Sequence, residues 1–226
     1  MKTFIAVTCG LMVSLAVSAL FAQSPSASTP IPVEQEPRHR LVFADERLRV
    51  LEVRIAPGDT TLEHRHDYDL ATVNIENGPT RTRDRGADWG SVRPRAVGGV
   101  NVNEYTGKST AHVVQSVGDR AYRLTGVENL KAGAWSTYPP IDDAGARVVA
   151  DTRAFRAYEV HLTPGQRVVH THPVPVVVVF VTPDVVALPP DGSLSRPGDW
   201  TVVPPGVGHL FAAGRASATV VEIEVR

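Results

Sequence analysis

The amino-acid sequence predicts an all-β protein made of two similar barrel-like units in tandem, and three observations support this prediction. The chain of 226 residues contains 18 glycines and 18 prolines, which indicates many turns and short strands. No segment of ten residues or more carries an apolar stripe at helical spacing. A series of strand, Pro-Gly turn and histidine pair occurs twice, with an offset of 106 to 107 residues between the copies. Turns at intervals of about ten residues suit an antiparallel sandwich or barrel.

The N-terminal segment is typical of an exported protein. Lys2 precedes an apolar run over residues 4–21 and no positive cluster follows it, which predicts a signal peptide at residues 1–22 and no stable membrane insertion after cleavage. Residues 23–39 are rich in Ser, Pro and Ala and are predicted to form a disordered tail. The only cysteine, Cys9, lies in the signal peptide, which excludes cysteine-based catalysis in the mature chain. We therefore expect a secreted or periplasmic protein.

Charge and length limit the partners and the number of domains. Lys and Arg total 23 against 24 Asp and Glu, so the formal net charge is −1 and no broad positive field is available to hold a phosphate backbone. Nucleic acid is therefore excluded as an expected partner. The rest of the chain is long enough for two small units. The repeat places the first at residues 40–140 and the second at residues 141–226.

Each unit has the same order of features: an alternating strand, a Pro-Gly turn, a short strand and two histidines one residue apart. These features fall at residues 50–55, 57–58 and 64–66 in the first copy and at residues 158–162, 164–165 and 170–172 in the second. A further strand-like run follows each histidine pair, at residues 70–76 and 174–181. The repetition indicates that the two units share one architecture.

The histidines carry the candidate chemistry. Residues i and i+2 of a strand project from the same face, so each His-x-His pair presents two imidazoles on one side of a sheet. A third histidine from a later strand completes each set, and three neutral imidazoles with open positions suit a divalent metal. The predicted ligands are His64, His66, His112, His170, His172 and His209. The remaining His39 and His161 match nothing in this pattern and are expected to be solvated or structural.

These motifs resemble those of the cupin superfamily, whose first motif reads G-x5-H-x-H-x3-4-E-x6-G and whose second reads G-x5-P-x-G-x2-H-x3-N. The first unit matches the first motif at Gly58, His64, His66 and Gly78. Residues 198–209 match the second motif as far as its histidine. The resemblance implies two jelly-roll barrels in tandem, a bicupin, with the six histidines as metal ligands. It also implies pairing of barrels into a homodimer.

The sequence departs from the family pattern where a carboxylate ligand is usual. The family's glutamate would fall at Leu70 or Ala71 in the first unit and at Val176 or Val177 in the second. Both sites are therefore expected to hold three histidines and no carboxylate. Asp69 could replace the glutamate only through a bulge, because a shift of one residue turns a strand side chain to the opposite face.

The linings of the two barrels are expected to differ. Residues 174–181 make the second interior apolar, which suits either a small hydrophobic substrate or a strand buried on both faces. The first interior is more polar. The arginine-rich loop at residues 78–100 either covers the mouth of the first barrel and attracts an anion or is simply exposed. His112 lacks the Pro-x-Gly of the motif and is the least secure ligand.

The expected function follows from the charge of a three-histidine site. Neutral imidazoles leave a divalent ion its full charge, which suits a bidentate anion such as an enolate or a carboxylate. Such sites are similar to those of cupin dioxygenases that use iron(II), with Zn, Ni, Cu and Mn as alternatives. We expect an exported iron(II)-type dioxygenase or a related enzyme acting on a small organic anion; the alternative is a non-catalytic bicupin that binds a metal or a small ligand. No general base or nucleophile stands out beyond the ligands.

Overall fold

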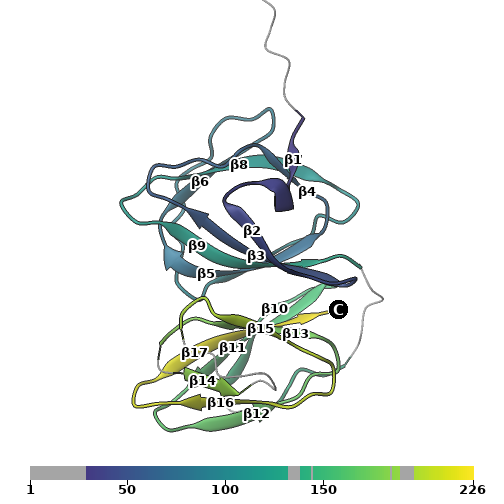
Figure 1. Cartoon of the computed structure of the whole chain (residues 1–226), viewed down its shortest axis with the longest axis vertical. Coiled ribbons are helices and arrows are strands. Elements are labelled where there is room, and N and C mark those ends of the chain that lie inside the picture. The colour runs from purple at the N-terminus through teal and green to yellow at the C-terminus, as the bar shows by residue number, and fades with distance from the viewer. Residues whose placement is uncertain (1–28, 132–137, 144, 184, 189–195) are drawn as a thin grey trace, which may run out of the picture.

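The computed structural model describes residues 29–131, 138–143, 145–183, 185–188 and 196–226, which fold into two β-barrels stacked along the longest axis of the molecule (Figure 1). This is the predicted tandem pair of jelly-roll barrels. Within the described residues the helical structure is one 3-10 turn, η1 (Val33–Gln35), and no helix is long and apolar enough to cross a membrane. The signal peptide expected at residues 1–22 lies outside the described part of the chain.

The first barrel consists of two facing sheets. One has the strand order β2-β3-β9-β5-β7 and the other has the order β1-β4-β8-β6. The strands of the first sheet are β2 (His39–Ala44), β3 (Leu48–Ile55), β9 (Tyr122–Asn129), β5 (Asp69–Asn77) and β7 (Val100–Asn103). Those of the second sheet are β1 (Ile31–Pro32), β4 (His64–His66), β8 (Thr110–Ser116) and β6 (Thr80–Asp84).

The second barrel repeats this plan. Its five-stranded sheet has the order β10-β11-β17-β13-β15, and its smaller sheet has the order β12-β16-β14. The larger sheet contains β10 (Ala146–Asp151), β11 (Phe155–Leu162), β17 (Ala218–Val225), β13 (Val176–Phe180) and β15 (Trp200–Val203). The smaller one contains β12 (Arg167–His170), β16 (His209–Ala213) and β14 (Val185–Leu188).

The register of the central strands is identical in the two barrels. Strand β3 pairs with β9 from Leu48 opposite Asn129, and β11 pairs with β17 from Phe155 opposite Val225. Each residue of β9 in the first barrel therefore has a counterpart in β17 of the second barrel. The first edge strand of each barrel also shifts register by a bulge at the same point. This correspondence allows the two interiors to be compared position by position.

The two five-stranded sheets pack face to face and form one continuous core between the barrels (Figure 1). Alternate residues of β3 and β5, such as Val50 and Val73, contact this core, and the second barrel contributes Val179 and Ile223. Trp200 adds a hydrogen bond from its indole N–H to the Glu52 carboxylate across the interface (3.3 Å). Full burial of each such aliphatic side chain contributes about 1.5–3 kcal/mol. The two barrels therefore share one hydrophobic core.

The segment before residue 40 differs from the disordered tail predicted for residues 23–39. Ile31 pairs in parallel with His64 of β4, Val33 is buried in the first barrel, and His39 begins β2. The composition is that of a linker only as far as residue 30, and the apolar side chains that follow have a barrel interior to fill. The N-terminal arm, defined as residues 31–39, is therefore part of the first barrel.

Candidate functional site

The three predicted ligands of the first barrel converge in its interior. His64 and His66 lie on β4 and project from the same face, and His112 on β8 stands directly opposite His64. One ring nitrogen from each residue lies within 4.8 Å of the others. The ring centroids of His64 and His112 are 4.7 Å apart, and those of His66 and His112 are 5.0 Å apart. A strand of three residues is enough to point both His64 and His66 into the interior, because the first and third side chains of a strand lie on the same face.

The hydrogen bonds of this cluster leave nitrogen atoms free for a metal. His64 donates from Nδ1 to the carbonyl of Leu62 (2.9 Å), so in the neutral ring Nε2 carries only a lone pair. That Nε2 is buried without a hydrogen-bond partner, and so is Nδ1 of His66. An unsatisfied buried polar atom costs about 1–3 kcal/mol, which coordination of an ion would remove. The donation of Nδ1 to a carbonyl is also the usual support of a metal-bound histidine. The residues present therefore fit a divalent metal.

Burial keeps these imidazoles neutral. It lowers the pKa of His64 to about 3, that of His66 to about 2 and that of His112 to about 4. Each ring is uncharged at neutral pH, which is the form that binds a metal without first losing a proton. His112, the least secure of the predicted ligands, also belongs to the cluster, because one of its ring nitrogens lies within 4.8 Å of those of His64 and His66.

No carboxylate joins this cluster among the described residues. The Asp69 carboxylate accepts hydrogen bonds from the backbone N–H groups of Tyr105 (2.7 Å) and Thr106 (2.8 Å), so it holds the loop after β7. The alternative in which a bulge turns Asp69 toward the histidines is therefore wrong. Asp67 is engaged by Arg65 outside the cluster.

The second barrel gathers four groups instead of the expected three. His170, His172 and His209 meet Glu222, which comes from the last strand, β17. Glu222 lies 2.7 Å from Nδ1 of His170, 3.2 Å from Nε2 of His172 and 2.5 Å from Nε2 of His209. The expectation of a site without a carboxylate is thus wrong for this barrel. The family position at residues 176–177 is apolar as predicted, but another strand supplies the carboxylate.

A signal for Glu222 was present in the sequence. Glu222 and Glu224 alternate with Val221, Ile223 and Val225 in a strand whose other side chains are apolar except for Thr219. Both glutamates are fully buried, and Glu224 accepts a hydrogen bond from Nδ1 of His172 (2.8 Å). Carboxylates are almost never fully buried unless they are paired. Two of them on one face of an apolar strand therefore predict buried cationic or metal partners.

The second cluster carries charged groups, whereas the histidines of the first cluster are neutral. Burial opposes ionisation of Glu222, but hydrogen bonds from the three imidazoles hold its pKa far below the ordinary range. Burial likewise opposes protonation of His172, but hydrogen bonds with Glu222 and Glu224 raise its pKa to about 9. The second cluster is therefore a buried ion cluster at neutral pH. A metal entering it has to displace a proton.

Replacing Glu222 by glutamine is expected to destabilise the metal-free protein by about 3–5 kcal/mol at pH 7, because removal of one partner leaves buried charges uncompensated. Urea unfolding would measure the loss. The matched control is Glu159→Gln on the neighbouring strand β11, where a half-exposed carboxylate pairs with Arg147 at the surface. We expect a change below about 1 kcal/mol for the control. An equally small change for Glu222→Gln would contradict the ion cluster.

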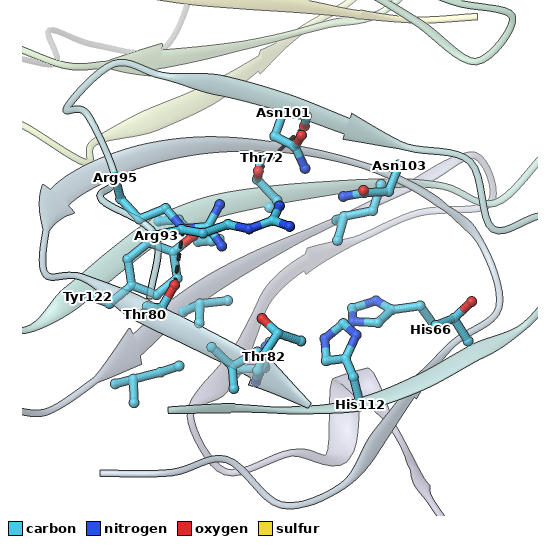
Figure 2. A pocket seen from close by; sticks show the side chains of 18 of the residues that line it. His66, Thr72, Thr80, Thr82, Arg93, Arg95, Asn101, Asn103, His112 and Tyr122 are labelled. Atoms are coloured by element: carbon cyan, nitrogen blue, oxygen red, sulfur yellow. Dashed lines mark hydrogen bonds between the residues drawn. The ribbon is translucent and has the colours of Figure 1, made fainter. Parts of the chain in front are cut away.

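The first barrel encloses a cavity of about 520 Å³ that reaches its histidines. Figure 2 shows His66 and His112 on one side of this cavity and Arg93 and Arg95 on the other. Polar side chains of β5 and β7 line one wall, and an apolar surface on β3 and β9 lines another. The volume is that of a pocket for a small organic molecule. The cavity joins a candidate metal centre to two arginines, and the carboxylates of Asp84 and Asp88 also line it.

The loop at residues 78–100 supplies these arginines. Arg93 exchanges two backbone hydrogen bonds with Thr80 (2.8 and 3.1 Å). Arg95 donates from Nε to the Thr80 hydroxyl (3.1 Å) and lies 5.6 Å over the ring of Tyr122. Both arginines line the cavity, with Arg93 exposed and Arg95 half-buried, so the loop lies at the mouth of the barrel and is also open to solvent. Arg81 and Arg83 instead stack on Trp89 outside the cavity.

The interiors of the two barrels differ at one position of the last strand, residue 126 in β9 and residue 222 in β17. Gly126 lines the cavity, and the shared register places it where the second barrel has Glu222. In the second barrel the space is filled by Tyr158, Phe180 and Phe211, which are fully buried. Of the two alternatives for its apolar strand, burial on both faces is therefore the correct one. The cavity belongs to the more polar barrel.

No protein-family model matches the sequence, and no curated protein matches it significantly. Solved structures do share its fold. AerE from Microcystis aeruginosa aligns at a TM-score of 0.63 and 12% identity over 87% of this chain and 98% of that chain. A cupin 2 conserved barrel domain protein from Leptotrichia buccalis aligns at 0.55 and 8% identity over 83% and 88%. A salicylate 1,2-dioxygenase from Pseudaminobacter salicylatoxidans aligns at 0.58 and 11% identity over 81% and 72%.

Proposed function

Because the chain has the tandem cupin fold, we propose that it is a metal-dependent enzyme whose active site lies in the first barrel. In this proposal His64, His66 and His112 hold a divalent ion, iron(II) in the first instance, and the adjoining cavity binds a small organic anion. The observation that carries the proposal is the geometry of the cavity, which places arginine side chains opposite three neutral imidazoles, of which His64 and His66 each have a buried ring nitrogen without a hydrogen-bond partner among the described residues. The reaction class proposed is oxygen-dependent cleavage or a related oxidation.

The residues of this chain have separable tasks. The three histidines would hold the ion by one nitrogen each and leave positions open for a ligand. When bound, the ion would supply a Lewis-acidic centre of full double charge and, if it is iron(II), redox chemistry with oxygen. Arg93 and Arg95 attract and orient the anionic group of the substrate. Apolar side chains such as Leu51 and Leu124 keep one wall dry, which strengthens both electrostatic interactions.

The structural neighbours support the choice of substrate class without fixing it. One is named a salicylate 1,2-dioxygenase and another an oxalate decarboxylase from Bacillus subtilis, which aligns at a TM-score of 0.58 and 15% identity over 80% of this chain and 69% of that chain. Both names describe enzymes of organic carboxylates. We further propose that the chain is exported, acts as a homodimer and uses its second barrel as a closed structural unit.

The proposal is tested by metal content and oxygen uptake together. The mature chain, purified without chelator and reconstituted with iron(II), is compared with the His64→Ala, His66→Ala double variant. We expect the variant to lose one metal per chain and all oxygen uptake with hydroxyaromatic acids or β-diketones. Zinc, nickel, copper and manganese serve as alternative ions. A wild-type chain that takes up none of these ions would overturn the metal-dependent function, and anion binding without turnover would favour the non-catalytic alternative.

A test of the anion site uses Arg95→Met. A charge-assisted hydrogen bond contributes about 1.5–3 kcal/mol, so we expect carboxylate affinity to fall about 10- to 100-fold by calorimetry. The metal content should stay unchanged, since Arg95 is not a ligand. Arg54→Met is the matched control, because Arg54 lies on β3 with its side chain exposed on the opposite face. Equal affinities in the two variants would exclude a role of Arg95 in anion binding.

A further inference from the structure

A fourth histidine lines the cavity of the first barrel. His39, at the start of β2, was expected to be solvated or structural, but it is buried and belongs to the cavity wall. Its ring centroid lies 4.6 Å from that of His64. It is not one of the three histidines whose nitrogens lie within 4.8 Å of one another. His39 is therefore adjacent to the candidate metal ligands but separate from them.

Glu36 fixes the orientation of the His39 ring. The Nδ1 atom of His39 lies 2.6 Å from the Glu36 carboxylate, which also accepts hydrogen bonds from the backbone N–H groups of Arg38 (2.6 Å) and Leu62 (3.1 Å). Burial opposes ionisation of Glu36, but these hydrogen bonds lower its pKa to about 2. Since a carboxylate only accepts, Nδ1 of His39 carries the proton. In the neutral ring with this tautomer, Nε2 carries a lone pair and can accept a hydrogen bond.

The N-terminal arm holds this pair rigidly in the barrel. Ile31 pairs with His64 of β4, and Val33 packs in the barrel interior. Arg38 donates two hydrogen bonds to Asp59, from Nε (2.9 Å) and Nη2 (2.8 Å). A bidentate pair of this kind has a defined geometry. Contacts on both sides of Glu36 therefore fix where His39 stands.

The second barrel lacks the pair. The shared register places Ala146 of β10 at the position of His39 in β2. The imidazole therefore occurs in the barrel that has a cavity and is missing from the barrel whose interior is filled with side chains. Structural stability alone does not require this difference, because β10 forms the same edge strand without it.

We propose that His39 contacts the substrate and that Glu36 is its positioning residue, so that Nε2 of His39 accepts a hydrogen bond from a hydroxyl group of the bound anion. This inference rests on the proposed function and narrows its substrate class to anions that carry a hydroxyl or enol beside the anionic group. Arg93 and Arg95 only donate hydrogen bonds and recognise the anionic group. The acceptor on His39 recognises the neighbouring donor, and a site built to bond a hydroxyl discriminates strongly against analogues that lack it.

The test compares 2-hydroxybenzoate with benzoate as probes on the metal-loaded full chain. Calorimetry should show that the wild type prefers 2-hydroxybenzoate by about tenfold or more. In His39→Ala this preference should fall to about one, with benzoate affinity and metal content unchanged. His39→Gln, whose amide oxygen can accept, should restore part of the preference, and Glu36→Gln should reduce it. His161→Ala is the matched control, since His161 lies exposed on β11 of the second barrel.

The outcomes separate this inference from the proposed function. A wild type that binds metal but neither probe overturns both the anion site and the role of His39. A wild type whose preference survives in His39→Ala overturns the role of His39 alone. Loss of metal in His39→Ala would also overturn it, because His39 would then be a ligand. A structural role would lower the affinities for both probes equally and leave their ratio unchanged.

Discussion

Replacing Gly126 by glutamate is expected to abolish anion binding in the first barrel while its three histidines keep their metal. The shared register makes this substitution a copy of the second barrel, where Glu222 occupies the same position of the last strand. A glutamate at residue 126 would extend into the cavity beside the histidines, fill part of its volume and repel an anion. We expect the affinity for 2-hydroxybenzoate to fall by about 100-fold or more, or about 2.8 kcal/mol, measured by calorimetry on the metal-loaded protein.

The backbone at Gly126 accommodates this change. A Cβ atom there would meet side chains rather than backbone, with Leu70 Cδ1 at 3.3 Å and Leu124 Cδ1 at 3.7 Å, and the residue is not among the glycines with positive φ. Gly126→Ala is therefore the matched control, because it adds the methyl group without the carboxylate. We expect less than a tenfold loss of affinity for alanine. An undiminished affinity in Gly126→Glu would show that the anion binds elsewhere.

The metal-free protein is expected to lose stability steeply as the pH falls below 6.5. The folded pKa values of His64, His66 and His112 are about 3, 2 and 4, against an ordinary value of 6.5. Below pH 6.5 the unfolded chain binds protons that these buried rings cannot, so the free energy of unfolding decreases by up to about 1.4 kcal/mol per pH unit for each histidine. Three histidines together give about 4 kcal/mol per pH unit, which is a large fraction of the stability of a typical domain.

The second cluster does not offset this loss. The raised pKa of His172, about 9, adds stability that is complete below pH 6.5 and disappears as the pH rises through 9. The lowered pKa of Glu222 adds stability that is complete above pH 4.5 and disappears at lower pH. Neither contribution changes between pH 4.5 and 6.5. Glu128 of the first barrel offsets part of the loss, because burial raises its pKa to about 7 and it therefore holds a proton in the folded state between pH 4.5 and 7. The net acid slope is then about that of two histidines, and stability of the metal-free protein should be greatest near pH 6.5.

Urea unfolding of the chelator-treated protein at several pH values between 4.5 and 8 measures this profile. His66→Gln should reduce the acid slope by up to about 1.4 kcal/mol per pH unit, because one of the three imidazoles no longer titrates. Metal loading should shift the acid loss to lower pH, since the ion binds the neutral rings. A free energy of unfolding that stays constant or rises from pH 6.5 to 5 would contradict the burial of neutral histidines.

The fold and the two histidine clusters could be predicted because local rules determine them. Alternation on a strand fixes the directions of His64 and His66, whereas His170 ends β12 and His172 lies two residues beyond it, so only the repeat of the sequence pattern predicts the second pair. The cavity could not be assigned with the same certainty, because it depends on the side chain that is missing at Gly126. A single glycine in an interior strand does not change the alternation of apolar and polar residues in the sequence, so the sequence pattern does not reveal the cavity.

Glu222 and His39 were missed for a different reason. Glu222 lies on β17 and follows His209 by 13 residues, outside the spacing of the family motif. His39 is delivered by the N-terminal arm, whose pairing with β4 involves only Ile31 and Pro32. A bridge of two residues has no sequence pattern, so composition suggested a linker. In both cases tertiary pairing over a long range places the functional group.

The two barrels thus use one framework for opposite chemistry. The first has Gly126, His39 and neutral imidazoles around an open cavity, whereas the second has Glu222, Ala146 and an ion pair between Glu222 and His172 among buried aromatic side chains. The shared register makes these pairs of residues direct counterparts.

The central claim, that the first barrel holds the metal that meets the substrate, is tested most directly with cobalt(II) as a spectroscopic probe. The cobalt-loaded chain is titrated with 2-hydroxybenzoate while the visible absorption of the ion is followed. We predict a saturable spectral change in the wild type and in the His170→Gln, His172→Gln variant, and none in the His64→Gln, His66→Gln variant. A change that survives in the first-barrel variant and disappears in the second-barrel variant would contradict the account.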